Sequence, residues 1–326
     1  MIKSLKENFL SGDQSILFLN RRGYAQLMLC QSCGKTLQCD HCNISLTLHQ
    51  SKDKLACHYC GFSRKTATLC PNCQSETLIS VGFGTERVES ELKKIIPQAR
   101  IARLDRDTTL KRHDFIKILR EVHHREVDVL IGTQMVAKGH HFPGVTLVGV
   151  IWADASLGIP DYKSSERTFQ ILTQVFGRAG RGDKPGRVIV QTHYPDHYSI
   201  KTAQSHEYTV LFDQEIALRK ALSYPPFSRL INIRFEGKQM KAVGNCAQAV
   251  AKYVKNHTLR QSMEVLGPSP APLSILRDLH RWQLLIKSSN LTVLSTICEA
   301  LKLYKTKLSG MSSVKLTIDV DPESML

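Results

Sequence analysis

Residues Val127–Gln134 have the sequence VDVLIGTQ, an apolar run followed at once by a glycine and a threonine. The run predicts a buried strand, Gly132 permits a close backbone approach, and Thr133 can cap a following helix. Similar strand and helix patterns alternate over the first two thirds of the chain. The other predicted strands are Ser15–Leu19, Leu78–Val81, Arg100–Leu104, Thr146–Trp152 and Arg187–Thr192, and the predicted helices are Thr85–Ile96, Arg112–His124 and Lys163–Ala179. This alternation predicts an α/β fold whose parallel sheet carries helices on both faces and binds ligands beyond the carboxyl ends of its strands.

The last third of the chain predicts a smaller α+β domain. Ile231, Ile233 and Phe235 alternate as they would in a strand. Further strands are predicted at Glu264–Leu266, Trp282–Ile286 and Val314–Val320, with helices around Val243–Val254 and over Asn290–Leu308. The resulting order βαββαβ is a split βαβ, or ferredoxin-like, layout.

Composition limits the kind of protein. The longest nearly apolar run, Val145–Ala153, has nine residues, whereas a membrane-spanning helix needs about 20. Glu7 and Asn8 lie where a secretory signal would be apolar, so we expect a cytoplasmic protein without a membrane span. The net charge of +15 favours a polyanionic partner. The last third, residues 210–326, is the most basic part of the chain, with 16 basic and 9 acidic side chains.

Eight of the ten cysteines form four C-x-x-C pairs within 44 residues. The pairs are Cys30/Cys33, Cys39/Cys42, Cys57/Cys60 and Cys70/Cys73. In a cytosolic chain such paired cysteines indicate zinc ligands rather than disulfides, and their number predicts two Zn(Cys)4 sites. Since all four positions of each ion would be filled by sulfur, both sites should be structural.

The grouping of the four pairs has alternatives. Fourteen residues separate Cys42 from Cys57, close to the usual spacing between the two pairs of a zinc ribbon. We therefore favour a nested arrangement, with Cys39, Cys42, Cys57 and Cys60 on one ion and Cys30, Cys33, Cys70 and Cys73 on the other. A cross-braced arrangement remains open. His41 and His58 are expected to be bystanders.

A further loop, whose residue types suit ligand binding, lies at the end of the predicted helix Lys163–Ala179. Residues Gln174–Arg181 have the sequence QVFGRAGR. At helical spacing, Gln174, Arg178 and Arg181 cluster opposite the apolar face of this helix. Two arginines beside glycines suit phosphate oxygens, because guanidinium groups bind them through two hydrogen bonds.

Gln174–Arg181 resembles motif VI of superfamily 2 helicases, and Gly132–Pro143 resembles motif V. The same order of features includes Phe18–Tyr24, the cysteine pairs, Gly84–Glu89, Leu104–Asp107 and the terminal Asp319–Pro322. Together they make the sequence similar to the PriA family of primosomal replication restart helicases, from about Ile16 to the end of the chain.

The resemblance implies a RecA-like second helicase lobe that carries a double Zn(Cys)4 insertion and is followed by a C-terminal DNA-binding domain. The expected domains are residues 1–29 with 74–209 for the lobe, 30–73 for the insertion and 210–326 for the last domain. Arg181 would be the arginine finger for ATP held on a first lobe, and Arg178 would be its partner. Nucleotide-binding roles are also implied for Gln174, Thr133 and Gly139, and a DNA contact for Lys138.

The chain departs from the family pattern in one respect. It contains no GxxxxGK[ST] phosphate loop and no DExH-type acidic motif. Gly34-Lys35-Thr36 is not the end of such a phosphate loop, because Leu29 lies at the position that requires the first glycine. The sequence therefore looks like only the C-terminal part of a family member. We expect ATP and Mg²⁺ to bind only together with a first helicase lobe, and no ATPase activity from this chain alone.

Two classes of function follow. The first is the C-terminal half of an ATP-dependent 3′ to 5′ DNA helicase that binds stalled or branched forks and promotes primosome assembly. Its implied partners are forked DNA, primosome proteins and single-stranded DNA-binding protein, with Arg281 as a DNA contact. The alternative is a non-catalytic zinc-containing protein that binds DNA or the primosome, and DNA-stimulated ATPase activity separates the two.

Overall fold

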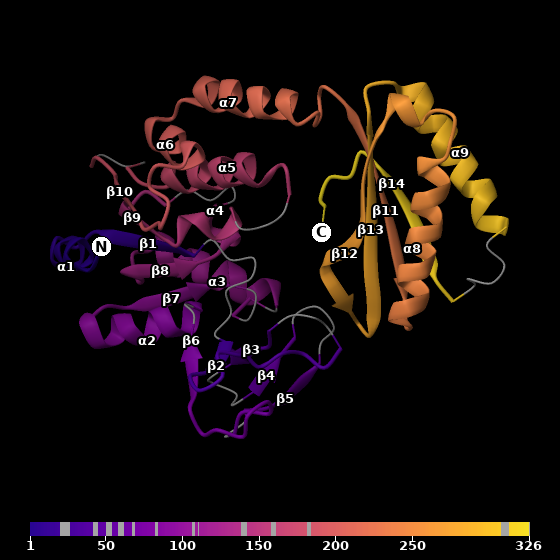
Figure 1. The fold of residues 1–326 in the computed structure, drawn as a ribbon. Helices are drawn as coiled ribbons and strands as arrows, with labels where there is room; N and C mark the ends of the chain where they lie inside the picture. Colours follow the sequence, from indigo (N-terminus) through magenta and orange to yellow (C-terminus); the bar gives the residue numbers. More distant parts are fainter. Residues whose placement is uncertain are drawn as a thin grey trace. The chain divides into compact units, whose positions relative to one another are not determined.

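The computed structural model describes residues 1–19, 27–41, 45–49, 54–57, 62–66, 69–81, 84–105, 108–109, 111–137, 142–157, 161–180, 184–307 and 313–325. The chain divides into two compact units (Figure 1). The first comprises Met1–Gln26, Ser80–Ile159 and Lys163–Phe212, and the second comprises Leu27–Ile79, Pro160–Tyr162 and Asp213–Leu326. The second unit thus includes both the cysteine-rich segment and the last third of the chain. The expected division into three domains stays a prediction.

The first unit is built on a five-stranded parallel sheet. Its strands are β1 (Gln14–Leu19), β7 (Ile101–Leu104), β8 (Val129–Gly132), β9 (Val145–Ile151) and β10 (Arg187–Val190), in the order β10-β9-β1-β8-β7. In the central strand, Ile16 pairs with Leu130 of β8 and Val148 of β9. The sequence predicts all five strands to within two residues at each end, and the predicted α/β lobe is confirmed.

Helices cover both faces of this sheet because β1 is apolar on both sides. Ile16 and Phe18 enter one hydrophobic core, and Leu17 and Leu19 enter another. The first core packs against α3 (Arg112–His123), α4 (Gln134–Ala137), α5 (Ser164–Phe176) and α6 (Tyr198–Ser205), and the second against α1 (Ile2–Leu10) and α2 (Thr85–Ile95). Burial of a strand on both faces is typical of a parallel sheet between helical layers. No helix in the described part of the chain is long and apolar enough to cross a membrane.

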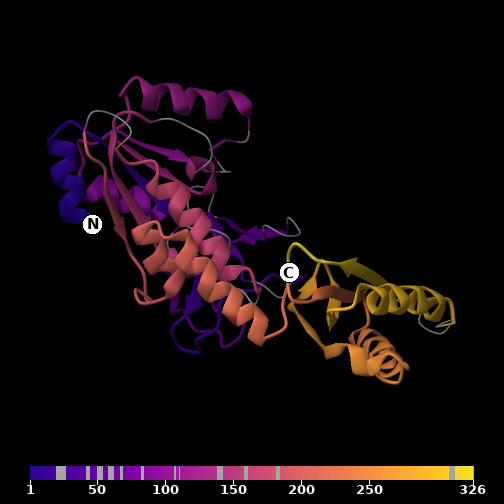
Figure 2. The same cartoon turned by 90° about the horizontal axis from the view of Figure 1, so that it is seen from above.

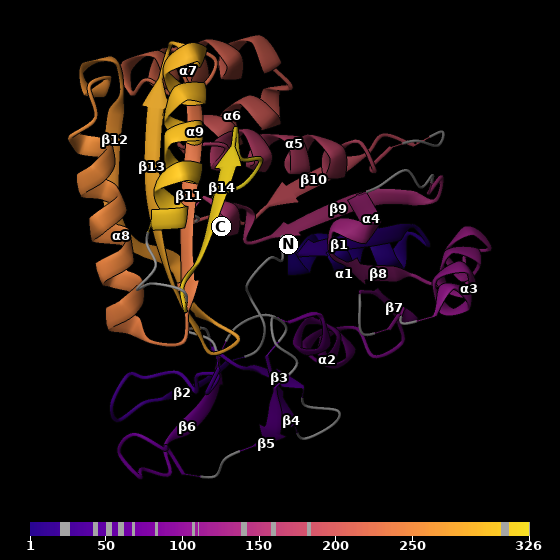
Figure 3. The same cartoon turned by 90° about the vertical axis from the view of Figure 1, so that its right-hand side faces the viewer.

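The cysteine-rich segment forms two small sheets (Figure 3). One pairs β2 (Leu27–Cys30) with β6 (Leu78–Val81), and the other joins β3 (Thr47–His49), β4 (Lys54–Ala56) and β5 (Ser63–Lys65). Leu78–Val81 was predicted as a strand of the alternating α/β pattern. It is a strand, but it pairs with β2 and closes the cysteine-rich segment. Its apolar residues specify burial in a sheet and do not specify which sheet.

The last third of the chain folds as βαββαβ. Its elements are β11 (Arg229–Gly237), α8 (Met240–Lys255), β12 (Glu264–Leu276), β13 (Leu279–Ser288), α9 (Leu291–Lys307) and β14 (Lys315–Val320). The strands are antiparallel in the order β12-β13-β11-β14, and both helices lie on one face of the sheet (Figures 1 and 2). Ile231, Ile233 and Phe235 point into the core beneath these helices. The predicted ferredoxin-like domain is confirmed, and α7 (Tyr208–Ala221) precedes it.

Candidate functional site

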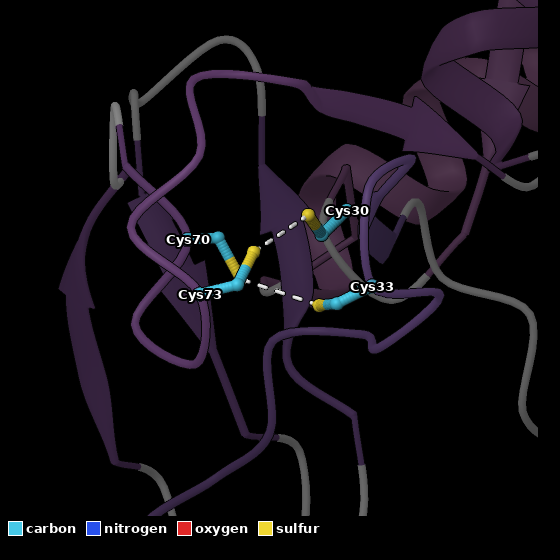
Figure 4. Close-up of side chains that lie close together, drawn as sticks. All are labelled: Cys30, Cys33, Cys70 and Cys73. Atoms are coloured by element: carbon cyan, nitrogen blue, oxygen red, sulfur yellow. Dashed lines mark hydrogen bonds between the residues drawn. The ribbon is translucent and has the colours of Figure 1, made fainter.

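The first and fourth cysteine pairs meet in one group (Figure 4). The Sγ atoms of Cys30 and Cys73 are 3.5 Å apart, and those of Cys33 and Cys70 are 3.7 Å apart. All four sulfurs lie within 4.8 Å of one another. Four sulfurs at about 2.3 Å from a tetrahedral zinc ion are about 3.8 Å apart, so this group fits zinc. Its membership is the one that the nested arrangement predicts.

Two matching turns present these cysteines. In the first, the Gly34 amide donates to the Cys30 carbonyl at 2.8 Å, and in the second the Gln74 amide donates to the Cys70 carbonyl at 2.8 Å. Gly34 and Gln74 both have positive φ, 69° and 59°. The Cys30 amide donates to the Lys35 carbonyl, and the Cys70 amide donates to the Ser75 carbonyl, both at 2.9 Å. Each turn thus aims two sulfurs at a common point, and the pairing of β2 with β6 brings the turns together.

The thiols of this group do not ionise independently. Burial would raise the pKa of Cys30, but hydrogen bonds from the Cys33 amide and from the Cys73 and Thr77 side chains lower it to about 6. For Cys73 the Ser75 amide lowers the pKa, but burial and the neighbouring sulfurs raise it to about 12. One thiolate therefore disfavours the next, and a divalent cation is the natural means of stabilising all four together.

The second predicted group is only partly described. Cys39 and Cys57 are buried in a hydrophobic cluster with Leu46 and Leu55. Cys42, Cys60 and His58 lie outside the described residues, so the inner zinc site stays a prediction. The ring of His41 contacts the last domain, with its Nδ1 atom 2.7 Å from Asp278 Oδ1, and the amide of His41 donates to Cys39 Sγ at 3.4 Å.

At the carboxyl edge of the parallel sheet, the structure joins the ends of α4 and α5. Arg178 is 8% exposed, and its Nη2 atom donates to the Ala137 carbonyl at 2.8 Å. Its Nε atom donates to the Gln174 carbonyl at 3.3 Å. Helix α5 ends at Phe176, so Arg178 lies beyond the helix, whereas the sequence predicts it within the helix on the face opposite the apolar one. The side chain of Gln174 is exposed, and Arg178 turns inward.

Part of this edge lies outside the described residues. Lys138, Gly139 and Arg181 are among the residues that are not described. Thr133 precedes α4, and its carbonyl accepts from the Val136 amide at 3.0 Å. The structure therefore brings Arg178 to the end of α4 and leaves the roles of the other predicted residues as predictions.

Gly180 and Gly186 come into close backbone contact. Gly180 has a φ of +70°, and its amide donates to the Val145 carbonyl at 3.1 Å. A Cβ atom at Gly180 would lie 2.4 Å from the Gly186 amide nitrogen, and one at Gly186 would lie 2.4 Å from the Gly180 nitrogen. Two backbone segments touch here, and neither position has room for a side chain. This contact gives a physical reason for the second glycine of the motif.

A buried network at the end of β7 was not among the predicted site residues. The Thr85 hydroxyl donates to Asp105 Oδ2 at 2.6 Å, and both residues are 2% exposed. Arg103 pairs with Glu86 at 3.3 Å and with Glu89 at 3.2 Å. The network ties α2 to β7 at the edge where parallel sheets bind ligands. Both halves of the network lie in stretches that carry the family resemblance, Gly84–Glu89 and Leu104–Asp107. Because the two stretches are far apart in the sequence, no local pattern indicates that they touch.

Arg281, the predicted DNA contact of the last domain, is 6% exposed. It lies opposite Glu236 across β11 and β13, and its Nε atom donates to Glu236 Oε1 at 3.0 Å. Trp282 points to the other face and packs against the core. Arg281 would have to leave its carboxylate partner to reach a phosphate, and its DNA contact stays a prediction.

Residues 39–65 match the family described as the PriA DNA helicase Cys-rich region (CRR) domain, and residues 220–323 match the Primosomal protein N C-terminal domain. Replication restart protein PriA of Bacillus subtilis (strain 168) is 41% identical over 327 residues, which cover 100% of this chain. The chain is thus similar over its whole length to a part of this PriA protein. The PriA proteins of Haemophilus influenzae and Synechocystis sp. are 37% and 41% identical over 326 and 316 residues, covering 100% and 96% of this chain.

The chain spans less than half of each of these PriA relatives, namely 40%, 44% and 37% of their lengths. Among solved structures, the helicase domain of Pyrococcus furiosus Hef matches 63% of this chain and 27% of that chain at 18% identity, with a TM-score of 0.29. That score is too low to compare the two folds in detail. The PriA matches account for both the cysteine-rich segment and the last domain.

Proposed function

We propose that the chain is the C-terminal half of an ATP-dependent 3′ to 5′ DNA helicase of replication restart. The observation that carries the proposal is the match to replication restart proteins along the whole chain, at 41% identity to the Bacillus subtilis relative. The five-stranded parallel lobe supports it, because the two stretches that resemble helicase motifs V and VI meet at its carboxyl edge. The protein would act on stalled or branched forks in the cytoplasm and promote primosome assembly.

In this proposal the lobe supplies arginines to a nucleotide held on another lobe. Arg181 is the arginine finger, which lowers the barrier by stabilising charge on the transferred phosphoryl group. Arg178 holds the end of α4 in place through the Ala137 carbonyl and is the partner of Arg181. Gln174, Thr133 and Gly139 line the nucleotide side, and Lys138 contacts the DNA strand.

Two zinc ions complete the proposal as structural ions. The outer site uses Cys30, Cys33, Cys70 and Cys73, whose sulfur separations support it. The inner site uses Cys39, Cys42, Cys57 and Cys60. With four thiolates on each ion there is no open position for a water molecule, so the ions stabilise the fold of the segment and do not hydrolyse a substrate. The last domain contributes DNA binding, with Arg281 as a candidate contact. Primosome proteins and single-stranded DNA-binding protein are the proposed protein partners.

ATP hydrolysis tests this function. The assay compares the chain alone, the chain with forked DNA, and the chain mixed with the part of the Bacillus subtilis relative that it does not match. We expect hydrolysis only in the mixture, reduced about 10³-fold or more by Arg181→Ala. The matched control is Arg187→Ala, which removes an exposed arginine of β10.

The outcomes of this assay distinguish the proposed helicase function from the non-catalytic alternative. Hydrolysis by the chain alone would contradict the expectation that the chain is inactive without a phosphate loop. Fork binding without hydrolysis in any mixture would favour the alternative function, a non-catalytic zinc-containing protein that binds DNA or the primosome. The absence of a GxxxxGK[ST] loop from the sequence is the observation that keeps this alternative in view.

A further inference from the structure

The two helices of the last domain carry most of its positive charge. Together α8 and α9 contain six lysines and a single carboxylate, Glu299, which gives them a net charge of +5. The lysines are Lys241, Lys252 and Lys255 of α8 and Lys302, Lys305 and Lys307 of α9. Lys241, Lys252, Lys255 and Lys302 are exposed. Since both helices lie on one face of the sheet (Figure 1), the charge belongs to the helical layer of the domain.

Four basic side chains of the strands are instead neutralised by carboxylates. The pairs are Arg229–Asp321, Arg234–Asp319, Arg281–Glu236 and Lys287–Glu264. Among the residues that the structure describes, Lys241, Lys252 and Lys302 have no carboxylate partner. A paired cation must give up its carboxylate before it can bind a phosphate, whereas these lysines need only shed water. The helical layer is therefore the better surface for a polyanion.

The lysines of α8 are aligned along the helix. Lys241 and Lys252 are separated by about three helical turns, so they lie on the same side of α8, about 16 Å apart. Lys255 follows Lys252 within the next turn. Its Nζ atom donates to the Gly267 carbonyl at 3.2 Å, and an ammonium group has further protons for other acceptors. A row of cations of this kind suits the repeated phosphates of a nucleic acid strand.

A pocket with aromatic walls lies beside Lys252. Its volume is about 490 Å³, within the range of about 300–1,000 Å³ that ligand pockets have. Tyr253 of α8 and Tyr304 of α9 stack there, with ring centroids 4.0 Å apart and planes at 11°. The His257 ring stands edge-on to Tyr253, with centroids 6.3 Å apart and planes at 69°. All three rings are half-buried, so part of each ring surface is open to a ligand.

Polar side chains line the same pocket. Asn256, the C-cap residue of α8, and Thr258 are both exposed and contribute to its wall. An amide offers a donor and an acceptor together, and so does the edge of a nucleobase. The pocket thus combines aromatic rings for stacking, an amide for a base edge and the Lys252 ammonium for a phosphate. These are the parts of one nucleotide, whereas a peptide of acidic residues would use the lysines alone.

We propose that the helical layer of the last domain binds single-stranded nucleic acid, with one base in the pocket beside Tyr253 and Tyr304 and phosphates on the lysines of α8. The site rests on the DNA-binding role proposed above for the last domain and gives that role a location. It does not use Arg281, which lies on a strand and is paired with Glu236. Because every base has a ring face, binding by stacking tolerates many sequences.

Fluorescence anisotropy with the 326-residue chain tests the site. The two probes are a labelled oligothymidylate and an abasic oligomer of the same length, which has the same phosphates and no bases. The wild type should bind the oligothymidylate about 10-fold more tightly, because base stacking adds to phosphate binding. Tyr304→Leu should remove most of this difference, and Tyr304→Phe, which keeps the ring, should retain it. Asn256→Ala changes an exposed side chain and should weaken only the oligothymidylate, by about 2- to 10-fold.

A charge arm separates phosphate contacts from stacking. Lys252→Gln should weaken both probes alike and should reduce the slope of log affinity against log salt by about 0.7, the value for one phosphate contact on a single strand. The matched control is Lys315→Gln, which removes an exposed lysine of β14 that lies opposite Glu236 in the sheet. This control should change neither the affinity nor the slope.

Photo-crosslinking with a bromodeoxyuridine oligonucleotide locates the bound base, and crosslinks should map to residues 252–258 and Tyr304. Wild-type affinity in all these variants, with crosslinks elsewhere, would overturn the site while the DNA-binding role stands. If the wild type binds no oligonucleotide, the site and that role fail together. Binding of a polyglutamate peptide that Lys252→Gln weakens, without oligonucleotide binding, would overturn the proposal in favour of an acidic protein partner. ATP hydrolysis plays no part in these assays, so the site is tested whether or not the helicase function holds.

Discussion

The substitution Gly180→Ala tests the close backbone contact between Gly180 and Gly186. Its φ of +70° costs an alanine about 1–2 kcal/mol. An alanine Cβ would also lie 2.4 Å from the Gly186 amide nitrogen and 2.8 Å from its Cα, and backbone atoms cannot rotate away as a side chain would. Overpacking of this kind adds about 1–3 kcal/mol. We therefore expect Gly180→Ala to lower the free energy of unfolding of the first unit by about 2–5 kcal/mol.

Gly12→Ala is the matched control for this substitution. Gly12 has a φ of +71°, and an added Cβ meets no described atom within 4 Å. The control should therefore show the backbone cost alone, about 1–2 kcal/mol. Urea unfolding can be followed through Trp152 in a Trp282→Phe background, since the chain has only two tryptophans and they lie in different units. Equal losses for Gly12→Ala and Gly180→Ala would refute the close contact with Gly186.

Three further predictions concern metal, pH and charge. Cys33→Ser should lower the zinc content of the folded chain from two ions to one, measured by atomic emission, whereas Cys246→Ser, which changes a buried cysteine of α8, should leave it at two. Burial would raise the pKa of Asp128, but hydrogen bonds from Arg100 lower it below its usual value, which is near 3.9. The stability contributed by this pair is therefore present above about pH 4 and lost as the pH falls through the lowered pKa, so Asp128→Asn should reduce the acid dependence of urea unfolding. Arg281→Ala leaves a carboxylate partner unpaired and should destabilise the last domain by about 2–3 kcal/mol, while lower DNA affinity at unchanged stability would instead support its predicted DNA contact.

The sequence was most informative for the cysteine pairs, because their spacing is itself the pattern of a metal-binding site. The C-x-x-C pairs indicated metal ligation, and Cys30, Cys33, Cys70 and Cys73 meet as the nested arrangement predicts. The strands of the parallel sheet were evident because a strand buried on both faces has a continuous apolar run. Leu78–Val81 has the same character but a different partner, and no local pattern distinguishes the two.

The arginine loop shows where periodicity fails. The helical pattern placed Arg178 beside Gln174 and Arg181, opposite the apolar face, because it assumed a helix as far as Ala179. In the structure Gly177 ends α5, and the chain turns Arg178 toward Ala137. The stacking of Tyr253 on Tyr304 was equally beyond prediction, because the two residues are far apart in the sequence. Contacts between distant segments decide both positions, and local propensity does not report them.

The central place of β1 has a consequence for the growing polypeptide. All six of its residues are buried, yet its two neighbours in the sheet begin only at Val129 and Val145. At about 5–20 residues per second, a ribosome needs on the order of 10 s to make the intervening chain. During that delay β1 is an exposed apolar strand, which is the kind of segment that aggregates or recruits chaperones. The cysteine pairs, complete by Cys73, can take up metal and fold in the same interval, well before the sheet that surrounds β1 is synthesised.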